Sequence, residues 1–511
     1  MSWKPRPWGG PALWVGAALL ILAVALERLV RLERGEGARG AAPVLLVHCA
    51  KGLRPAVEEL ARSYEQQTGT RIELSYGGSG TLLSQLQVRP RGELYIAGDD
   101  SYVVGEGGER PSARELGLVE EVFALARMRP VIAVGAGNPR GVGALADLLR
   151  EDVRVGLALP EAAAVGRVMR EACVEQGIWD ALRARALVEE PTVTELANAL
   201  ALGTIDAAVL WDATVAQWEG LEAVRTAPLE ARVRDVTLGV LRDSERARDA
   251  LRFARYLSSR DRGAAVWERH GFESVEGDAW TLVPRVELFY GAMLDAAIAE
   301  RIAAFEEREG CMVDTVKNGC GVLVAQMRAG ASPDAYFSCD TSFLDMVEER
   351  FAAPTDVSAN AMVLLVPRGN PRGLASLGDL AREGLRVGLA HPEKSALGEL
   401  TRRQMRAQGV HEAFVQSGNW LVESATGDYL VNQLSVGSLD AVVVYRSNAA
   451  HVLDELEVVP LEGRGALAVQ PYAVAKASEH PQLMERLLDF LLRGESQERF
   501  LELGFEWRAD L

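Results

Sequence analysis

Two hydrophobic patterns follow one another along most of the chain. Short apolar runs, such as residues 44–47, 71–76 and 129–134, have the length of buried strands. The stretches between them, such as residues 54–68 and 81–87, place apolar residues at the three- and four-residue spacing of amphipathic helices. This order predicts an α/β fold. We expect a parallel or mixed sheet, helices on both of its faces, and ligands at the carboxyl ends of the strands.

The whole pattern occurs twice. The sequence GNPRG at residues 137–141 recurs at residues 369–373, an offset of 232 (369 − 137). At the same offset, VRVGLALPE at residues 153–161 matches LRVGLAHPE at residues 385–393. Such a series indicates an internal duplication.

The two copies differ by one loop. GGSG at residues 77–80 corresponds to NGCG at residues 318–321, an offset of 241 (318 − 77), so the first copy has extra residues that include 105–111. We therefore expect a first module over residues 44–283 and a second, divergent module over residues 284–511. Each is too long for a solenoid repeat and has the length of a two-lobed unit.

Residues 1–43 do not follow this pattern. The stretch 7–26 carries no charge, which predicts a hydrophobic helix that serves as an export signal or a membrane anchor. Residues 27–39 are charged and rich in arginine, and small residues suited to cleavage follow at 40–42. We expect an uncleaved anchor that holds the protein on the periplasmic side of the membrane. A secreted protein with a cleaved signal, or a buried core helix, are the alternatives.

The formal net charge of −17 argues against nucleic acid or anionic lipid as a partner, although a small anion can still bind in a locally positive pocket. The five cysteines show no CxxC spacing and no accompanying histidine cluster, so we expect no metal and no cofactor. Either all five are small buried residues, or one pair, such as Cys311 and Cys320, forms a disulfide in an exported chain.

Four loops of the first module lead from a strand into a helix. Helix N-termini favour anions, because their unpaired N–H groups and the helix dipole both attract negative charge. In the second of these loops, Gly78 and Gly80 allow close approach of the backbone, and Ser79 offers a hydroxyl. A plain strand-to-helix turn is the alternative interpretation of this loop.

The other three loops offer further candidates. Lys51, after the first strand, either adds positive charge to a pocket or is an exposed lysine at a helix start. In the third loop, the small residues Ala162 and Ala163 leave backbone amides free to face a ligand. In the fourth, Trp211 either forms a wall of the pocket or packs in the core.

Taken in order, these segments resemble the molybdate-binding proteins that feed ABC transporters, a family of type II periplasmic binding proteins. The resemblance covers both modules and rests on CAKGLRPAVEELARSYEQQTG, ELSYGGSGTLLSQL, LYIAGDDSY, PVIAVGAGNPRG, VRVGLALPEAAAVGR and IDAAVLWDATVA. It implies that each module has two α/β lobes joined by a hinge. It further implies a small oxyanion ligand, molybdate or tungstate, and an ABC transporter permease in the membrane as the partner.

The resemblance also implies ligand contacts in the first module. Ser79 matches the serine of the glycine–serine loop, and the region of Ala162 matches the third loop. Gly52 stands where a first-loop serine is usual, and Trp211 stands where a tyrosine is usual. Lys51 and backbone amides are the expected substitutes for these two missing hydroxyls.

In the second module, the loops at residues 291–293 and 318–321 contain no hydroxyl. Tyr445 stands at the position of the family's tyrosine, and Ser395 is available in the third loop. We expect a degenerate module that acts in dimerisation, in docking or on a different ligand.

The sequence therefore predicts capture without chemistry, by an extracytoplasmic substrate-binding component of an ABC transporter for molybdate or a related oxyanion. A membrane-anchored sensor or scaffold with degenerate modules is the alternative. A transferase on the same fold is less favoured, because we find no Ser/His/Asp set, metal-ligand cluster or paired acids on matching loops.

Overall fold

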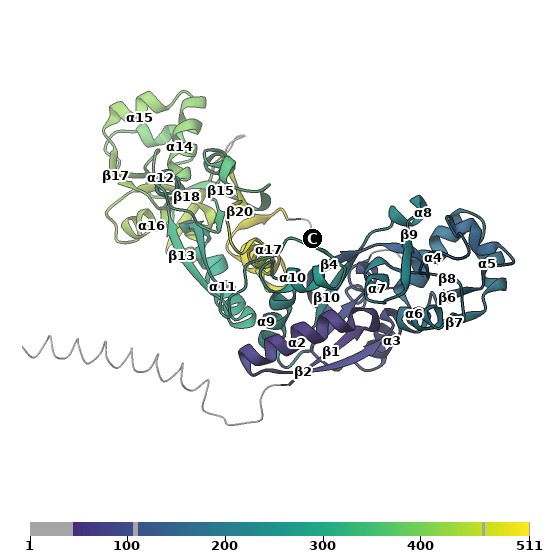
Figure 1. Ribbon diagram of the computed structural model, residues 1–511. Helices are drawn as coiled ribbons and strands as arrows, with labels where there is room; N and C mark the ends of the chain where they lie inside the picture. The colour runs from purple at the N-terminus through teal and green to yellow at the C-terminus, as the bar shows by residue number, and fades with distance from the viewer. Residues whose placement is uncertain (1–43, 106–110, 462–465, 510–511) are drawn as a thin grey trace, which may run out of the picture.

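The computed structural model describes residues 44–105, 111–461 and 466–509 (Figure 1). The hydrophobic segment at residues 7–26, on which the anchor prediction depends, lies outside these residues. Among the helices of the described residues, none combines the length and the apolar composition needed to cross a membrane.

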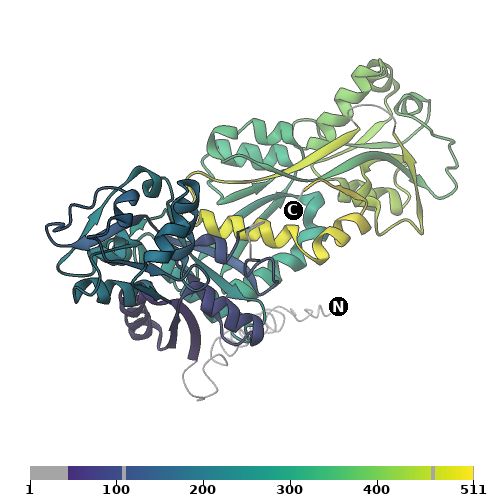
Figure 2. The ribbon, with the colours of Figure 1, turned by 90° about the vertical axis from the view of Figure 1, so that its right-hand side faces the viewer.

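The chain folds into two tandem modules of mixed α/β structure. Their buried apolar side chains form two separate cores, one from residues between 45 and 272 and the other from residues between 286 and 509. Figures 1 and 2 show the two modules side by side, the first in purple to teal and the second in green to yellow. The sequence repeat thus corresponds to two folding units.

The first module consists of two lobes, each with its own sheet. The strand orders are β11-β4-β10-β3-β1-β2 in the first lobe and β7-β6-β8-β5-β9 in the second. The strands are β1 (Val44–Ala50), β2 (Arg71–Gly77), β3 (Leu94–Ala97), β4 (Val119–Met128), β5 (Pro130–Gly135), β6 (Val155–Ala158), β7 (Val188–Glu190), β8 (Ala207–Trp211), β9 (Leu221–Val224), β10 (Arg234–Leu241) and β11 (Glu273–Ser274). The helices used below are α2 (Arg54–Thr68), α3 (Ser79–Val88), α4 (Ala164–Glu175), α6 (Val193–Ala201), α7 (Asp212–Ala216) and α9 (Ala247–Ser258).

Local sequence explains where α2 begins and ends. Pro55 lies in the first turn, where its missing N–H costs no hydrogen bond. Gly69 ends the helix with a φ of 72°, a conformation that glycine adopts without strain, and its N–H donates to the Glu65 carbonyl at 2.8 Å. The observed helix has the bounds that the periodicity predicts. Strand β1 pairs in parallel with both β2 and β3, which confirms the predicted α/β fold.

The chain crosses between the two lobes at Arg129. Strand β4 ends at Met128, and the next strand begins at Pro130, which has no N–H to continue a ladder. The Asp212 carboxylate holds the crossing residue, because its Oδ1 accepts the Arg129 N–H at 2.9 Å and the Ala213 N–H at 2.8 Å. The chain returns to the first lobe between β9 and β10.

The second module repeats these elements but joins its strands into one ten-stranded sheet. Its strand β15 (Thr355–Pro367) runs through both lobes without a break. Met362, inside this strand, corresponds to Pro130, the first residue of β5 in the first module. The two residues have equivalent partners, because Met362 pairs with Tyr445 and Pro130 pairs with Trp211. The other elements used below are β12 (Arg285–Gly291), β13 (Met312–Asn318), β14 (Ala335–Phe337), β18 (Ala441–Tyr445), β19 (Leu456–Pro460), β20 (Leu467–Val474), β21 (Phe505–Trp507), α11 (Asp295–Glu309), α12 (Cys320–Arg328), α14 (Ala396–Ala407), α16 (Gly427–Ser435) and α17 (Pro481–Leu492).

A buried ionic triad joins the modules where α9, α11 and α17 meet (Figure 1). The Glu309 carboxylate, 1% exposed, accepts from Nη1 of Arg255 and from Nε of Arg486, each at 2.6 Å. Burial alone would raise the pKa of Glu309, but the two guanidinium groups outweigh it and hold this pKa below its usual value. The triad links one residue of the first module to two of the second.

Two further contacts cross the same boundary. The Asp278 carboxylate accepts the N–H groups of Gln482 and Leu483 at 2.8 and 2.9 Å, so a residue that follows the first core caps the N-terminus of α17. Arg308 donates to Glu120 at 3.0 Å. These polar contacts fix the orientation of one module on the other.

We predict that Glu309→Ala destabilises the protein by about 3–5 kcal/mol, because it leaves two buried guanidinium groups without a counter-charge. The matched control is Asp314→Ala, which breaks a solvent-exposed pair with Arg285 and should leave the transition midpoint close to that of the unchanged protein. Urea denaturation followed by circular dichroism measures both changes. Equal transition midpoints for the two variants would contradict the role given to the triad.

Candidate functional site

A small cavity lies between the two lobes of the first module, at the carboxyl ends of β1 and β2. Both lobes contribute to its wall. The lining residues are Ala50, Lys51, Gly52, Leu53, Gly77, Gly78, Ser79, Gly98 and Met128, together with Ala163, Ala164, Thr192, Val193, Trp211 and Thr214 from the second lobe. The cavity therefore brings together residues from all four of the loops that the sequence singles out.

The lobes touch each other directly beside this cavity. The Gly80 N–H donates to the Ala162 carbonyl at 3.0 Å across the cleft. A β-carbon on Gly78 would lie 2.3 Å from the Ala162 carbonyl oxygen, and one on Gly80 would lie 2.3 Å from that of Glu161. Glycine is thus required at both positions by the opposite lobe, whereas the sequence suggested that an anion required it.

Ser79 is the first residue of α3 and is 2% exposed. Its Oγ accepts the Gly98 N–H at 3.1 Å, so the hydroxyl proton remains to donate. Its backbone carbonyl accepts from the Tyr95 hydroxyl at 2.8 Å. These contacts hold the serine side chain at the cavity wall.

Lys51 lines the cavity, but its ammonium group forms an ion pair with Glu195. The pair joins the first loop of one lobe to the first turn of α6 in the other lobe. Both side chains are 32% exposed, so solvent screens the pair. The positive charge that the sequence suggested for the pocket is therefore balanced locally.

The third loop differs from the expectation. The amides of Ala162 and Ala163 donate to the Leu159 carbonyl at 3.1 and 2.9 Å, because the loop closes on itself before α4 begins. Both amides that the sequence suggested for a ligand are thus engaged within their own loop, although Ala163 lines the cavity. Ala164, the first residue of α4, also lines the cavity and is better placed to offer an amide.

Gly52 and Trp211 stand where the resemblance implies hydroxyl side chains. A β-carbon on Gly52 would lie 2.7 Å from Cγ2 of Val193, so a side chain at this position would require Val193 to shift. Trp211, at the end of β8, is 3% exposed and forms part of the wall.

Sequence reasoning missed two hydroxyls at this cavity, those of Thr192 and Thr214. Thr192 precedes α6, and Thr214 lies inside α7. The loop from β7 into α6 has the same strand-to-helix form as the other four, and this signal points to Thr192. Thr214 lies in the fourth loop segment, three residues after Trp211, and no feature of the local sequence distinguishes its hydroxyl from that of an ordinary helical threonine.

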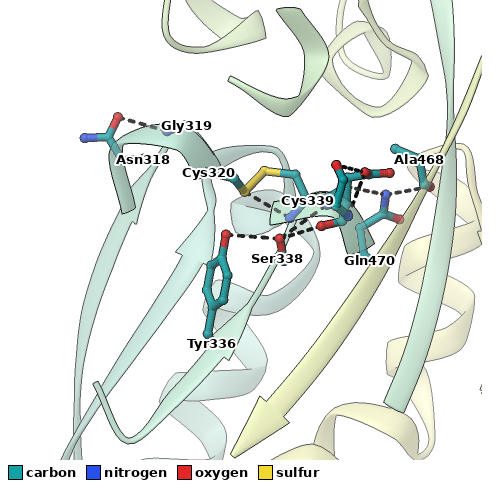
Figure 3. Close-up of a disulfide and its surroundings, with 10 residues drawn as sticks. Asn318, Gly319, Cys320, Tyr336, Ser338, Cys339, Ala468 and Gln470 are labelled. Atoms are coloured by element: carbon teal, nitrogen blue, oxygen red, sulfur yellow. Dashed lines mark hydrogen bonds between the residues drawn. A yellow bond between two sulfur atoms is a disulfide. The ribbon is translucent and has the colours of Figure 1, made fainter. Parts of the chain in front are cut away.

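In the second module a disulfide occupies the corresponding position. Cys320 and Cys339 align with Ser79 and Gly98 at the same offset of 241, and they are bonded to each other (Figure 3). The Cys339 N–H lies 3.0 Å from Sγ of Cys320, as the Gly98 N–H lies 3.1 Å from Oγ of Ser79. A β-carbon on Gly291 would lie 2.2 Å from Sγ of Cys339, so sulfur fills the space beside the first loop.

The disulfide corrects the cysteine expectation. Cys320 pairs with Cys339 and not with Cys311, because α12 and the end of β14 meet at the same edge of the sheet while Cys311 is buried before β13. Burial raises the pKa of Cys311 to about 12. Cys49, Cys173 and Cys311 are free thiols.

The two hydroxyls expected in the second module are buried. Ser395 precedes α14 and is 5% exposed, and its side chain does not cap the helix. Tyr445 is 3% exposed, and its hydroxyl has no hydrogen-bond partner among the described residues. Within the part of the chain that the structure describes, no cluster of side chains suited to a metal ion is found.

Comparison with known proteins gives two matches to one family model. The model for bacterial extracellular solute-binding proteins matches residues 45–273 and again residues 286–506. A putative binding protein of Haemophilus influenzae is 25% identical over 230 residues, which is 45% of this chain and 90% of the relative. The molybdate-binding protein ModA of Mycobacterium bovis is 28% identical over 225 residues, 43% of this chain and 84% of that protein.

Among solved structures, the periplasmic molybdate-binding protein of Azotobacter vinelandii matches with a TM-score of 0.39 and 17% identity. The match covers 45% of this chain and all of that one.

We predict that alkylation in denaturant without a reductant modifies the three cysteines outside the disulfide, and that all five react after reduction. Intact mass spectrometry counts the added groups. The control is Cys320→Ser/Cys339→Ser, which should give the same count with and without reductant. Labelling of all five without reduction would contradict the disulfide.

Proposed function

The chain belongs to the family of bacterial extracellular solute-binding proteins, and from this membership we propose that its first module captures a tetrahedral oxyanion, with molybdate or tungstate as the ligand. The family model and the relative ModA are described as solute-binding and molybdate-binding proteins, which supports capture of a ligand without a chemical reaction. We further propose that the module serves an ABC transporter permease on the extracytoplasmic side of the membrane, and that residues 7–26 anchor the chain there. The proposed boundary between the modules lies at residues 283 and 284.

The observation that carries the proposal is the convergence of three helix N-termini on one cavity. Helices α3, α4 and α6 all begin at its wall, one from the first lobe and two from the second. Their first amides and the helix dipoles favour an anion between the lobes. The Ser79 hydroxyl adds a neutral donor at the same place.

The chemistry of the wall favours an anion without a proton. The polar groups around the cavity are hydroxyls and helix-opening amides, and the Glu195 carboxylate is engaged by Lys51. At neutral pH phosphate carries a proton that needs an acceptor, whereas molybdate, tungstate and sulfate do not. A buried proton without an acceptor is costly. We therefore expect discrimination against phosphate.

We propose a structural or docking role for the second module, because a disulfide stands at its equivalent of Ser79. A membrane-anchored sensor or scaffold is the second candidate function. In that case the second module, with its disulfide, would bind a partner protein. The two functions differ in whether the first module binds an anion.

We predict one-to-one binding of molybdate by the full-length protein in isothermal titration calorimetry. Ser79→Ala should weaken binding by about tenfold to a hundredfold, since it removes one hydrogen bond to a charged group. The matched control is Ser84→Ala on the same helix, whose hydroxyl bonds to the Gly80 carbonyl and does not line the cavity. Absence of binding to molybdate, tungstate, sulfate and phosphate alike would reject the receptor and favour the scaffold.

A further inference from the structure

The cavity of the first module lacks two hydroxyl side chains that the resemblance leads us to expect. Gly52 has no side chain, and Trp211 replaces a tyrosine. A dianion enclosed between the lobes needs donors for four oxygens, because burying a charge without hydrogen bonds is costly. Other groups of this chain must therefore supply them.

Thr192 has a hydroxyl without a partner in this wall. The residue is 8% exposed, lines the cavity, and its Oγ1 makes no hydrogen bond within the described residues. It stands at the N-cap of α6, where a threonine normally accepts an N–H of its own helix, yet the side chain makes no such cap. A buried hydroxyl that forgoes its local partner is unfavourable in the empty protein and is free to donate to a ligand.

Thr214 lies across the cavity from the first loop. It is 4% exposed, and its Oγ1 lies 3.7 Å from the position of a β-carbon on Gly52. The threonine hydroxyl thus reaches the space that a first-loop side chain would face. A serine at position 52 would instead lie too close to Val193.

We propose that the hydroxyls of Thr192 and Thr214 donate hydrogen bonds to the bound oxyanion, and that they replace the missing serine and tyrosine as specificity-determining groups. This inference rests on the proposed function of the first module. It places two of the hydroxyl donors on the second lobe, opposite Ser79 on the first. The anion would then be held by hydroxyls from both lobes.

The second module supplies a matched contrast. Thr426 precedes α16 at the position that corresponds to Thr192, and it too leaves its helix without a side-chain cap. Asn448 replaces Thr214, and its side chain is engaged by the Tyr445 N–H at 3.1 Å and by Asp428 at 2.8 Å. The second module therefore has a disulfide in place of the Ser79 hydroxyl and an engaged asparagine in place of Thr214. Of these three hydroxyls in the first module, only that of Thr192 has an equivalent, in Thr426.

The test is titration of the full-length protein with molybdate and tungstate after Thr192→Val or Thr214→Val. Each change keeps the side-chain volume and removes the hydroxyl, so affinity should fall by about tenfold to a hundredfold, and further in the double variant. Thr426→Val is the control and should bind within about twofold of the unchanged protein.

Two companion measurements separate a ligand contact from a structural role. Thr192→Ser and Thr214→Ser keep the hydroxyl and should bind within a few-fold of the unchanged protein. The melting temperature of ligand-free Thr192→Val should stay equal or rise, because valine removes an unpartnered buried hydroxyl. If the serine variants lose as much affinity as the valine variants, or if ligand-free Thr192→Val melts well below the unchanged protein, the inference is overturned.

The outcomes also distinguish this inference from the proposed function. If Ser79→Ala weakens binding while both valine variants bind normally, the receptor stands and the threonine donors are rejected. If the unchanged protein binds neither anion, the proposed function fails and the inference falls with it.

Discussion

The lobes of the first module meet backbone to backbone, at a separation that leaves no space for a β-carbon on Gly78 or Gly80. This contact sets the size of the cavity, because the loop that carries Ser79 is held against the carbonyl of Ala162 by a hydrogen bond of 3.0 Å. The helices α3 and α4 therefore begin close together from opposite sides. The anion site that we propose depends on the glycines as much as on its donors, since a side chain at either glycine would separate the helix N-termini that face each other.

Much of this arrangement could be predicted from the sequence, because it depends on local patterns. The periodicity locates α2 at both ends, and the offset of 232 identifies the duplication. The details of the site depend instead on contacts between distant segments. In the loop before α4, the amides of Ala162 and Ala163 donate to the Leu159 carbonyl. No local sequence pattern predicts these two hydrogen bonds.

The same limitation explains the cysteines and the two threonines. Cys339 reaches Cys320 because β14 lies next to β12, and strand order is a property of the whole sheet. Thr192 and Thr214 reach the cavity because the second lobe closes on the first. One contact is common to both modules. The Gly98 N–H lies 3.1 Å from Oγ of Ser79 in the first, and the Cys339 N–H lies 3.0 Å from Sγ of Cys320 in the second. The two modules thus share the same backbone contact, with a serine hydroxyl at this position in the first and a disulfide in the second.

The unbroken strand β15 makes the two modules mechanically unequal. It is paired along its length, with β20 and β21 in one lobe and with β18 and β19 in the other, so bending it would break ladder hydrogen bonds. In the first module the strand is interrupted at Arg129, before a proline, and the backbone of the crossing residue is held by Asp212, whose N–H donates to the Arg129 carbonyl at 2.8 Å and whose carboxylate accepts the Arg129 N–H at 2.9 Å. A change in the angle between the lobes would therefore disrupt less strand pairing in the first module than in the second.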